Sequence, residues 1–176
     1  MIELDSFYIE KIQTKDAWNL CDFIVANEDR LKAFFPKTLE QNLTPDLSKR
    51  FVEIKVKQFE LKEEFLFTIK EKESHTLMGL IYLKELDWEN KQGEFAYCIG
   101  YQFEGKGLMS KTTNALSQYA FNNLGLKTLQ IIVHKSNIGS VKVAENCKFM
   151  WQKTLLNEFT PPNSEPLDME LYELYF

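Results

Sequence analysis

The chain of 176 residues has few of the side chains that build disulfide scaffolds or metal centres. Its three cysteines, Cys21, Cys98 and Cys147, are scattered and form no Cys-x-x-Cys pair, as is typical of a reduced intracellular protein. Its two histidines, His75 and His134, lie far apart in the sequence and predict no metal site. The sequence therefore favours a fold and an activity that need neither disulfides nor a bound metal.

Long apolar runs and an excess of basic residues are also missing. No apolar run approaches the roughly 20 residues that cross a bilayer. The first residues, MIELDSFYIEKIQ, carry acids where a secretory signal needs bases. The 21 Lys and Arg against 26 Asp and Glu give a net charge of -5, which argues against a nucleic-acid surface. We expect a cytoplasmic protein, monomeric or homodimeric, that binds neither membranes nor nucleic acid.

What the chain does have is enough apolar surface for one sizeable core. Hydrophobic residues make up 44% of it, with fourteen Phe, seven Tyr and three Trp. Chains split into several domains mainly beyond about 250 residues. We therefore expect a single domain over residues 1–176.

Apolar periodicity predicts an α+β fold with a mixed, mostly antiparallel, twisted sheet of about seven strands. Thr14 and Thr44 are expected to cap helices, and Pro36 to end any helix that reaches it. A central βαβ unit surrounds the segment 99–110. Strands are expected at 7–12, 65–69, 77–86, 94–99, 128–134, 151–158 and 169–174, and helices at 14–27, 45–61, 108–124 and 137–147.

The segment IGYQFEGKGLMS resembles three phosphate-binding motifs. From Gly100 it is a P-loop, except that Gly107 stands where a Mg²⁺-binding hydroxyl is needed. From Gly105 it is a dinucleotide fingerprint, except that Ser110 replaces the last glycine and no ribose-binding acid follows. From Gln102 it is Q-x-x-G-x-G with nothing missing. We favour the third motif.

Its chemistry suits a pyrophosphate. Gly105 and Gly107 let the backbone approach an anion closely. The N–H groups of about Gly105 to Met109 are expected at the start of the long helix, at the positive end of its macrodipole, where N–H groups have no partner within the helix. The loop is therefore expected to bind a pyrophosphate without a metal.

Two segments, YQFEGKGLMSKTTNALSQYAF and HKSNIGSVKVAENCKF, together resemble the GNAT acetyltransferases. The resemblance is greatest to the branch that acetylates the N-termini of ribosomal proteins. The family's Q/R-x-x-G-x-G/A is matched from Gln102, and its N-x-x-S by Asn137 and Ser140. Two positions depart from the pattern: Lys148 replaces a glycine, and Ala144 stands where many members have a catalytic tyrosine.

The resemblance implies acetyl-CoA as cosubstrate, an amine acceptor and no metal. It implies that the backbone of the strand before the loop pairs with the pantetheine arm, and that the loop and the N-x-x-S segment bind the rest. The implied coenzyme-binding residues are Tyr97, Ile99, Gln102, Gly105, Lys106, Gly107, Leu108, Met109, Asn137 and Ser140.

The catalytic candidates are two carboxylates and one hydroxyl. The amine must be neutral to attack, so a general base is needed. Glu94 and Glu158 both resemble acids that serve relatives, and the sequence does not choose between them. Ser140 is the expected proton donor to the thiolate, with a plain first-turn serine as the alternative. Asn137 is expected to bind the coenzyme, or to be only a helix cap.

Other reactive side chains have plainer interpretations. His134 ends a buried strand and is expected to be a structural residue rather than a catalytic one. Cys98 is expected to be a small buried hydrophobe rather than an acyl acceptor.

We therefore expect an acetyl-CoA-dependent N-acetyltransferase that acts on a primary amine, most simply a protein or peptide N-terminus. A polyamine-like small amine is the alternative acceptor, and a non-catalytic acyl-CoA-binding module is the alternative from another class.

Overall fold

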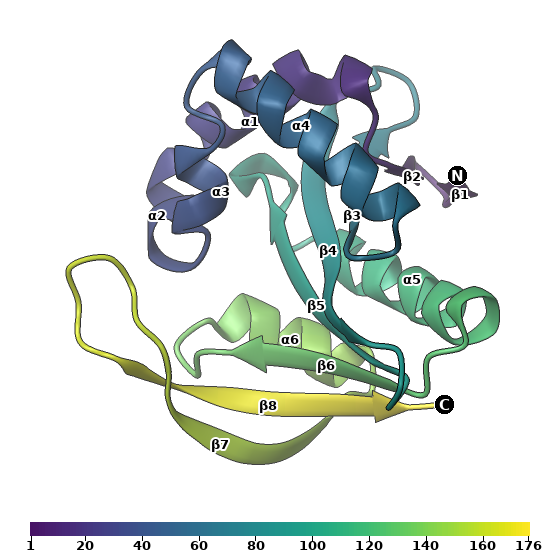
Figure 1. The fold of residues 1–176 in the computed structure, drawn as a ribbon, viewed down its shortest axis with the longest axis vertical. Coiled ribbons are helices and arrows are strands. Elements are labelled where there is room, and N and C mark those ends of the chain that lie inside the picture. The colour runs from purple at the N-terminus through teal and green to yellow at the C-terminus, as the bar shows by residue number, and fades with distance from the viewer. The chain divides into compact units, whose positions relative to one another are not determined.

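The computed structural model describes all 176 residues, and they form two compact units. The first contains residues 1–82 and 97–104, and the second contains residues 83–96 and 105–176. Strands β4 (Leu77–Asp87) and β5 (Gln92–Ile99) contribute to both units (Figure 1). The strand order is β1-β2-β3-β4-β5-β6-β8-β7.

The first unit combines three strands of its own with four helices. Strand β2 pairs antiparallel with both β1 and β3. Fully buried side chains from strands and helices, among them Phe7, Phe65 and Leu20, build its core. The elements are β1 (Ile2–Glu3), β2 (Phe7–Lys11), β3 (Phe65–Glu71), α1 (Ala17–Ala26), α2 (Glu28–Phe34), α3 (Pro36–Glu40) and α4 (Pro45–Glu60), with 3₁₀ turns at Thr14–Asp16 and Tyr101–Phe103.

One local prediction in this unit is wrong and two are confirmed. Thr14 does not cap a helix but begins a 3₁₀ turn, and the preceding Gln13 takes the cap position, its N–H donating to the Asp16 carboxylate at 2.9 Å. The prediction for Pro36 is confirmed, because α2 ends at Phe34; Pro36 is in addition the first residue of α3, and only Phe35 separates the two helices. Proline suits that position because the N–H it lacks would have no helical partner. The prediction for Thr44 is confirmed: its hydroxyl caps α4 by accepting the Leu47 N–H at 3.3 Å.

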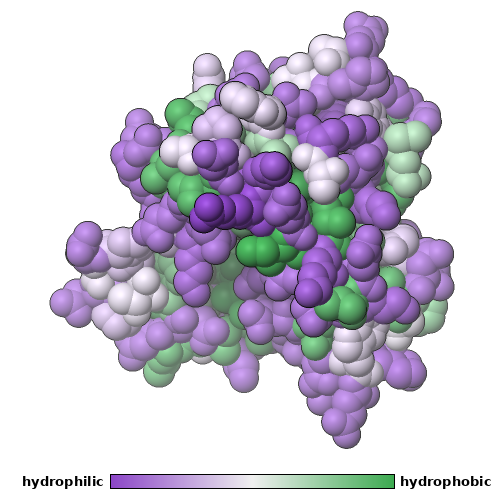
Figure 2. All heavy atoms as spheres, turned by 45° about the horizontal axis from the view of Figure 1, so that its top comes forward, coloured by the Kyte–Doolittle hydropathy of each residue, from purple (hydrophilic) through white to green (hydrophobic).

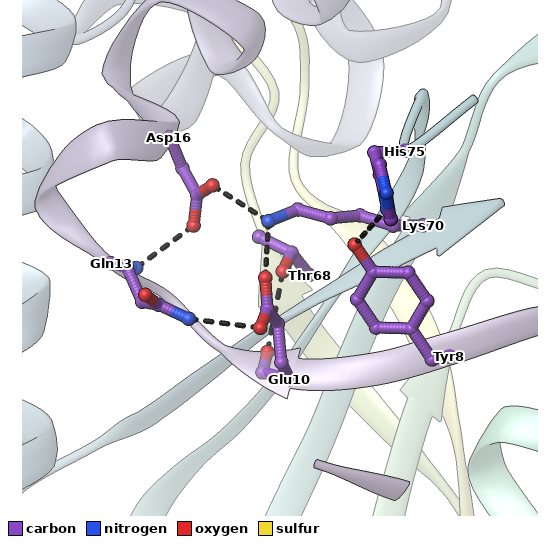
Figure 3. A network of polar contacts seen from close by, with 7 residues as sticks. All are labelled: Tyr8, Glu10, Gln13, Asp16, Thr68, Lys70 and His75. Atoms are coloured by element: carbon purple, nitrogen blue, oxygen red, sulfur yellow. Dashed lines mark hydrogen bonds and ion pairs between the residues drawn. The ribbon is translucent and has the colours of Figure 1, made fainter. Parts of the chain in front are cut away.

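A buried ion network holds the first unit's sheet to the start of its helices (Figure 3). The Lys70 ammonium donates to the Asp16 carboxylate at 2.7 Å and to the Glu10 carboxylate. The side chains of Lys70 and Asp16 are only 4% and 2% exposed. Such a buried charge is tolerated only because it is paired. The network therefore fixes the chain where β2 leads into α1.

The second unit contains the predicted βαβ arrangement. Strand β5 pairs parallel with β6, and α5 connects them. Strand β8 pairs antiparallel with both β6 and β7. Helix α6 lies behind β6 in Figure 1. The elements are α5 (Leu108–Leu124), β6 (Thr128–Val133), α6 (Ile138–Asn146), β7 (Met150–Phe159) and β8 (Leu167–Tyr175).

The predicted α+β class, with a mixed, mostly antiparallel sheet and a central βαβ unit, is confirmed. The sheet has eight strands rather than about seven. The strand that the sequence did not predict is β1, whose two residues are too few to show a period.

Hydrophilic side chains cover most of the face drawn in Figure 2, with hydrophobic ones between them in smaller patches. The large apolar side chains that are exposed include Trp18, Trp151 and Leu156. None of the helices is both long and apolar enough to cross a membrane.

Candidate active site

The glycine-rich loop adopts a backbone that favours glycine at two positions. Gly105 and Gly107 have φ angles of +71° and +70°, in the left-handed region. A Cβ added at either position would meet no heavy atom within 4 Å. The glycines are therefore required by backbone conformation rather than by crowding within the protein, and the space above them is open.

The loop ends in an uncapped helix start. Gly107 is the N-cap of the 17-residue α5, which has no side-chain cap and no acid in its first turn. The bond from the Lys111 N–H to the Gly107 carbonyl, 3.1 Å, begins the helix. The N–H groups before it lack helical partners and sit at the positive end of the macrodipole. These groups fit an anionic phosphate.

The predicted side chains around this loop differ in what they can contribute. Leu108 and Met109 are only 8% and 6% exposed, so their side chains are not available to a ligand. Lys106 and Gln102 are exposed. Gln102 belongs to the first unit and Lys106 to the second.

The strand that leads into the loop changes character along its length. Its parallel pairing with β6 ends at Phe95 and Ile131, although β6 continues to Val133. Buried and half-buried residues alternate up to Phe95, and the four residues from Ala96 to Ile99 are all half-buried. Tyr97 and Ile99 are in this stretch, in the first unit.

The turn from β6 to α6 is built around Asn137. Its Oδ1 accepts the Ser140 N–H at 3.2 Å and caps α6, so the helix-cap interpretation is confirmed. The cap uses the amide oxygen, and the amide Nδ2 takes no part in it. The Asn137 N–H also donates to the His134 carbonyl at 2.8 Å. Ser140 is the third residue of the helix and is half-buried.

The two departures from the family pattern have structural explanations. Ala144 is fully buried, so the site at this position offers no room for a tyrosine. Lys148 has a φ of +63°, in the region where glycine is preferred. The Phe149 N–H donates to the Ala144 carbonyl and the Lys148 N–H to the Glu145 carbonyl, both at 2.9 Å. This is a Schellman motif, which explains a glycine at position 148 in relatives.

Glu94 is a mostly buried carboxylate with one cationic partner. The Lys84 ammonium lies 2.8 Å from its Oε1, and only 13% of the Glu94 side chain is exposed. Burial raises the pKa of Glu94 above its usual range, Lys84 opposes this rise, and Glu85 and Glu158 add to it. A carboxylate with a raised pKa is a stronger proton acceptor. Sequence reasoning missed Lys84, since nothing in the sequence fixes the pairing of β4 with β5.

Glu158 lies on an irregular part of β7. Three residues of β7 separate Leu155 from Phe159, whereas only Asp168 separates their partners on β8. Asn157 within this bulge has a φ of +52°, and its N–H donates to the Asp168 carboxylate at 2.8 Å. Bulges of this kind redirect side chains. Glu158 therefore lies in a stretch of β7 that departs from regular strand pairing.

The environment of Cys98 agrees with its interpretation as a small hydrophobic residue rather than an acyl acceptor. Cys98 is half-buried, and the apolar surroundings of its thiol raise its pKa to about 12. The thiol is therefore protonated near neutral pH and is a poor nucleophile.

The second unit thus contains most of the predicted site. Glu94 and Glu158 influence each other electrostatically there. Residues 105–109 open α5, and Asn137 and Ser140 open α6. The end of α6 reaches the start of α5, because the Cys147 thiol donates to the Ser110 carbonyl at 3.3 Å. The second unit therefore carries an uncapped helix start that fits an anion, a carboxylate with a raised pKa and a hydroxyl, the kinds of group that acyl transfer to an amine requires.

Comparisons with known proteins agree with this chemistry. Residues 7–150 match the family model described as an acetyltransferase (GNAT) domain. A protein provisionally named ribosomal N-acetyltransferase YdaF, from Bacillus subtilis (strain 168), is 28% identical over 81% of this chain and 76% of its own length. Spermidine N(1)-acetyltransferase of Escherichia coli (strain K12) is 30% identical over 46% of this chain and 44% of its own.

A solved structure matches this fold over nearly the whole chain. The crystal structure of ribosomal-protein-S5-alanine acetyltransferase from Vibrio fischeri superposes with a TM-score of 0.92 at 19% identity. The match covers 99% of this chain and 95% of that one.

Proposed function

Because this chain belongs to the GNAT acetyltransferase family, we propose that it acetylates the α-amine at the N-terminus of a protein or peptide. Family membership makes it an N-acetyltransferase that uses acetyl-CoA. The choice of acceptor rests on the Lys84–Glu94 ion pair, 2.8 Å long. Lys84 balances the negative charge of the buried Glu94 carboxylate. The pair therefore offers the acceptor amine a group that can take its proton, but no net negative charge.

The residues at the loop fit acetyl-CoA. The N–H groups from Gly105 to Met109 would hold the pyrophosphate, because the left-handed glycines leave open space above the loop. Lys106 and Gln102 would add polar contacts, and the Asn137 amide would hold the pantetheine. In the first unit, the half-buried backbone at Tyr97 and Ile99 would pair with a pantetheine arm as an added strand would. When bound, acetyl-CoA supplies the acetyl group as a thioester.

Proton transfer is assigned to three side chains of the second unit. Glu94 takes a proton from the ammonium of the acceptor, directly or through water, and the neutral amine then attacks the thioester carbonyl. A terminal α-amine has a pKa of about 8, against about 10.4 for an alkylamine, so this base can deprotonate it more readily. Glu158 keeps the pKa of Glu94 raised and is the alternative base. Ser140 donates a hydrogen bond to the departing thiolate.

A polyamine is the second candidate acceptor. The partial match to spermidine N(1)-acetyltransferase favours it, as does the acidic balance of the chain. Under this alternative the exposed Glu158 attracts the cationic substrate.

A competition experiment separates the two acceptors. Purified protein is incubated with acetyl-CoA and equal concentrations of three acceptors: a lysine-free peptide with a free N-terminus, a lysine peptide with a blocked N-terminus, and spermidine. Mass spectrometry then measures each product. We expect the free N-terminus to be acetylated fastest. Preferential acetylation of spermidine would favour the second candidate, and no product from any amine would favour the non-catalytic module.

Ser140→Ala tests the proton donor. Turnover should fall by about two orders of magnitude, the lower end of the range for general acid–base catalysis, while acetyl-CoA affinity changes little. Unchanged turnover would remove Ser140 from the mechanism.

A further inference from the structure

His134 lies where β6 ends and the turn to α6 begins. Its Nδ1 is 2.7 Å from the Ser136 hydroxyl and 3.3 Å from the Ser136 backbone nitrogen. The next residue, Asn137, donates its N–H to the His134 carbonyl at 2.8 Å and caps α6 through Ser140. The side chain of His134 thus binds Ser136, and its main-chain carbonyl binds Asn137.

These contacts determine the tautomer of the ring. A backbone N–H can only donate, so Nδ1 must carry a lone pair and accept from Ser136. The hydroxyl of Ser136 then donates to the same nitrogen. The ring proton must be on Nε2. The contacts therefore require a neutral Nε2–H imidazole.

We infer that His134 is a positioning residue, which holds the 134–137 turn so that Asn137 and Ser140 meet the coenzyme in a fixed geometry. This inference rests on the proposed coenzyme A site. His134 acts through Nδ1 and touches neither the acyl group nor the amine. Without its acceptor, the Ser136 donors lose their partner and the turn before the helix loosens.

Two substitutions separate this role from proton transfer. In His134→Asn the amide Oδ1 takes the place of Nδ1 and can accept from Ser136. In His134→Gln the amide lies further out, where Nε2 was, and leaves the Ser136 donors unpaired. Positioning through Nδ1 predicts that asparagine largely rescues the enzyme and glutamine does not.

The expected loss in His134→Gln is a rise in the Kd and KM for acetyl-CoA of about threefold to tenfold, the worth of about one hydrogen bond. In His134→Asn these constants should stay close to those of the unsubstituted protein. Equal losses in both variants would overturn the role of Nδ1. A loss in kcat in both variants, with unchanged Kd, would also overturn it, because neither amide can replace an imidazole that transfers a proton directly.

The second histidine provides a matched control. His75 also uses Nδ1, 2.9 Å from the Tyr8 hydroxyl, but it follows β3 in the first unit. His75→Asn and His75→Gln should both leave acetyl-CoA binding unchanged. Circular dichroism and melting curves of all four variants show whether each is folded.

A further experiment uses the protein without any ligand and does not depend on its activity. With two histidines in the chain, long-range ¹H–¹⁵N spectra of the unsubstituted protein and of His75→Asn identify the His134 signals. We expect an unprotonated Nδ1 and a protonated Nε2, and the opposite tautomer would overturn the inference. Failure of the unsubstituted protein to bind acetyl-CoA would instead overturn the proposed function, whatever the tautomer.

Discussion

The two ends of α5 offer a matched test of the glycine loop. Gly107 begins the helix at φ +70° and Gly125 ends it at φ +73°. An added Cβ would meet nothing within 4 Å at either position. Gly107→Ala and Gly125→Ala therefore impose the same backbone penalty, but only Gly107 belongs to the proposed anion site.

The penalty to stability can be worked out and is the same for both. A left-handed conformation costs alanine about 1–2 kcal/mol. The less flexible unfolded chain returns about 0.4–1 kcal/mol. Each variant should thus lose about 1 kcal/mol of unfolding free energy, or about 2–4 °C in Tm for a chain of this size.

The effect on affinity should separate the two variants. In Gly107→Ala the methyl group comes between the loop N–H groups and a phosphate. Each charge-assisted hydrogen bond that is lost contributes about 1.5–3 kcal/mol, so acetyl-CoA should bind at least about tenfold more weakly. In Gly125→Ala the affinity should be unchanged.

Melting curves measure the stability of the unsubstituted protein and of the two alanine variants. Calorimetric titration with acetyl-CoA measures the affinity of each. Equal affinities in the two alanine variants would refute the assignment of this loop to the pyrophosphate. A much larger loss of Tm in one variant would refute the matched penalty.

Three further predictions concern stability and pH. Lys148→Gly should raise the unfolding free energy by about 0.5–1 kcal/mol, because glycine relieves the left-handed strain; a lower Tm would contradict this. Lys84→Met should raise the pKa of Glu94 further, because it removes the cation that lowers that pKa. Since the base must be ionised, the acidic limb of kcat/KM should move to higher pH, and an unmoved limb would argue against Glu94 as the base. Lys70→Met should destabilise the protein by about 3–5 kcal/mol in urea unfolding, because it leaves the buried Asp16 carboxylate without its cation. A loss below about 1 kcal/mol would mean that the network relaxes or takes up water.

The parts of the fold that sequence predicted are those with long, regular patterns. Helix α5 shows a sustained period of about 3.6 residues between two glycines, and both boundaries followed from that pattern. The parallel pairing of β5 with β6 followed from the βαβ order. By contrast, α2 and α3 are short and only Phe35 separates them. Pro36 begins α3, although at sequence level it indicates the end of a helix.

The site was predictable where it depends on the local backbone. Gly105 and Gly107 are recognisable because their conformation requires glycine, and Asn137 because a cap needs its side chain. The Lys84–Glu94 pair depends on the register between two strands, which no local pattern specifies. The bulge before Glu158 likewise arises from the pairing of β7 with β8.

Calorimetric titration of the purified protein with acetyl-CoA, with NAD and ATP as controls, tests the central claim most directly. We predict micromolar binding of acetyl-CoA and no comparable binding of the two controls. Absence of acetyl-CoA binding, or equal binding of NAD, would mean that Q-x-x-G-x-G at Gln102 is only a turn between a strand and a helix.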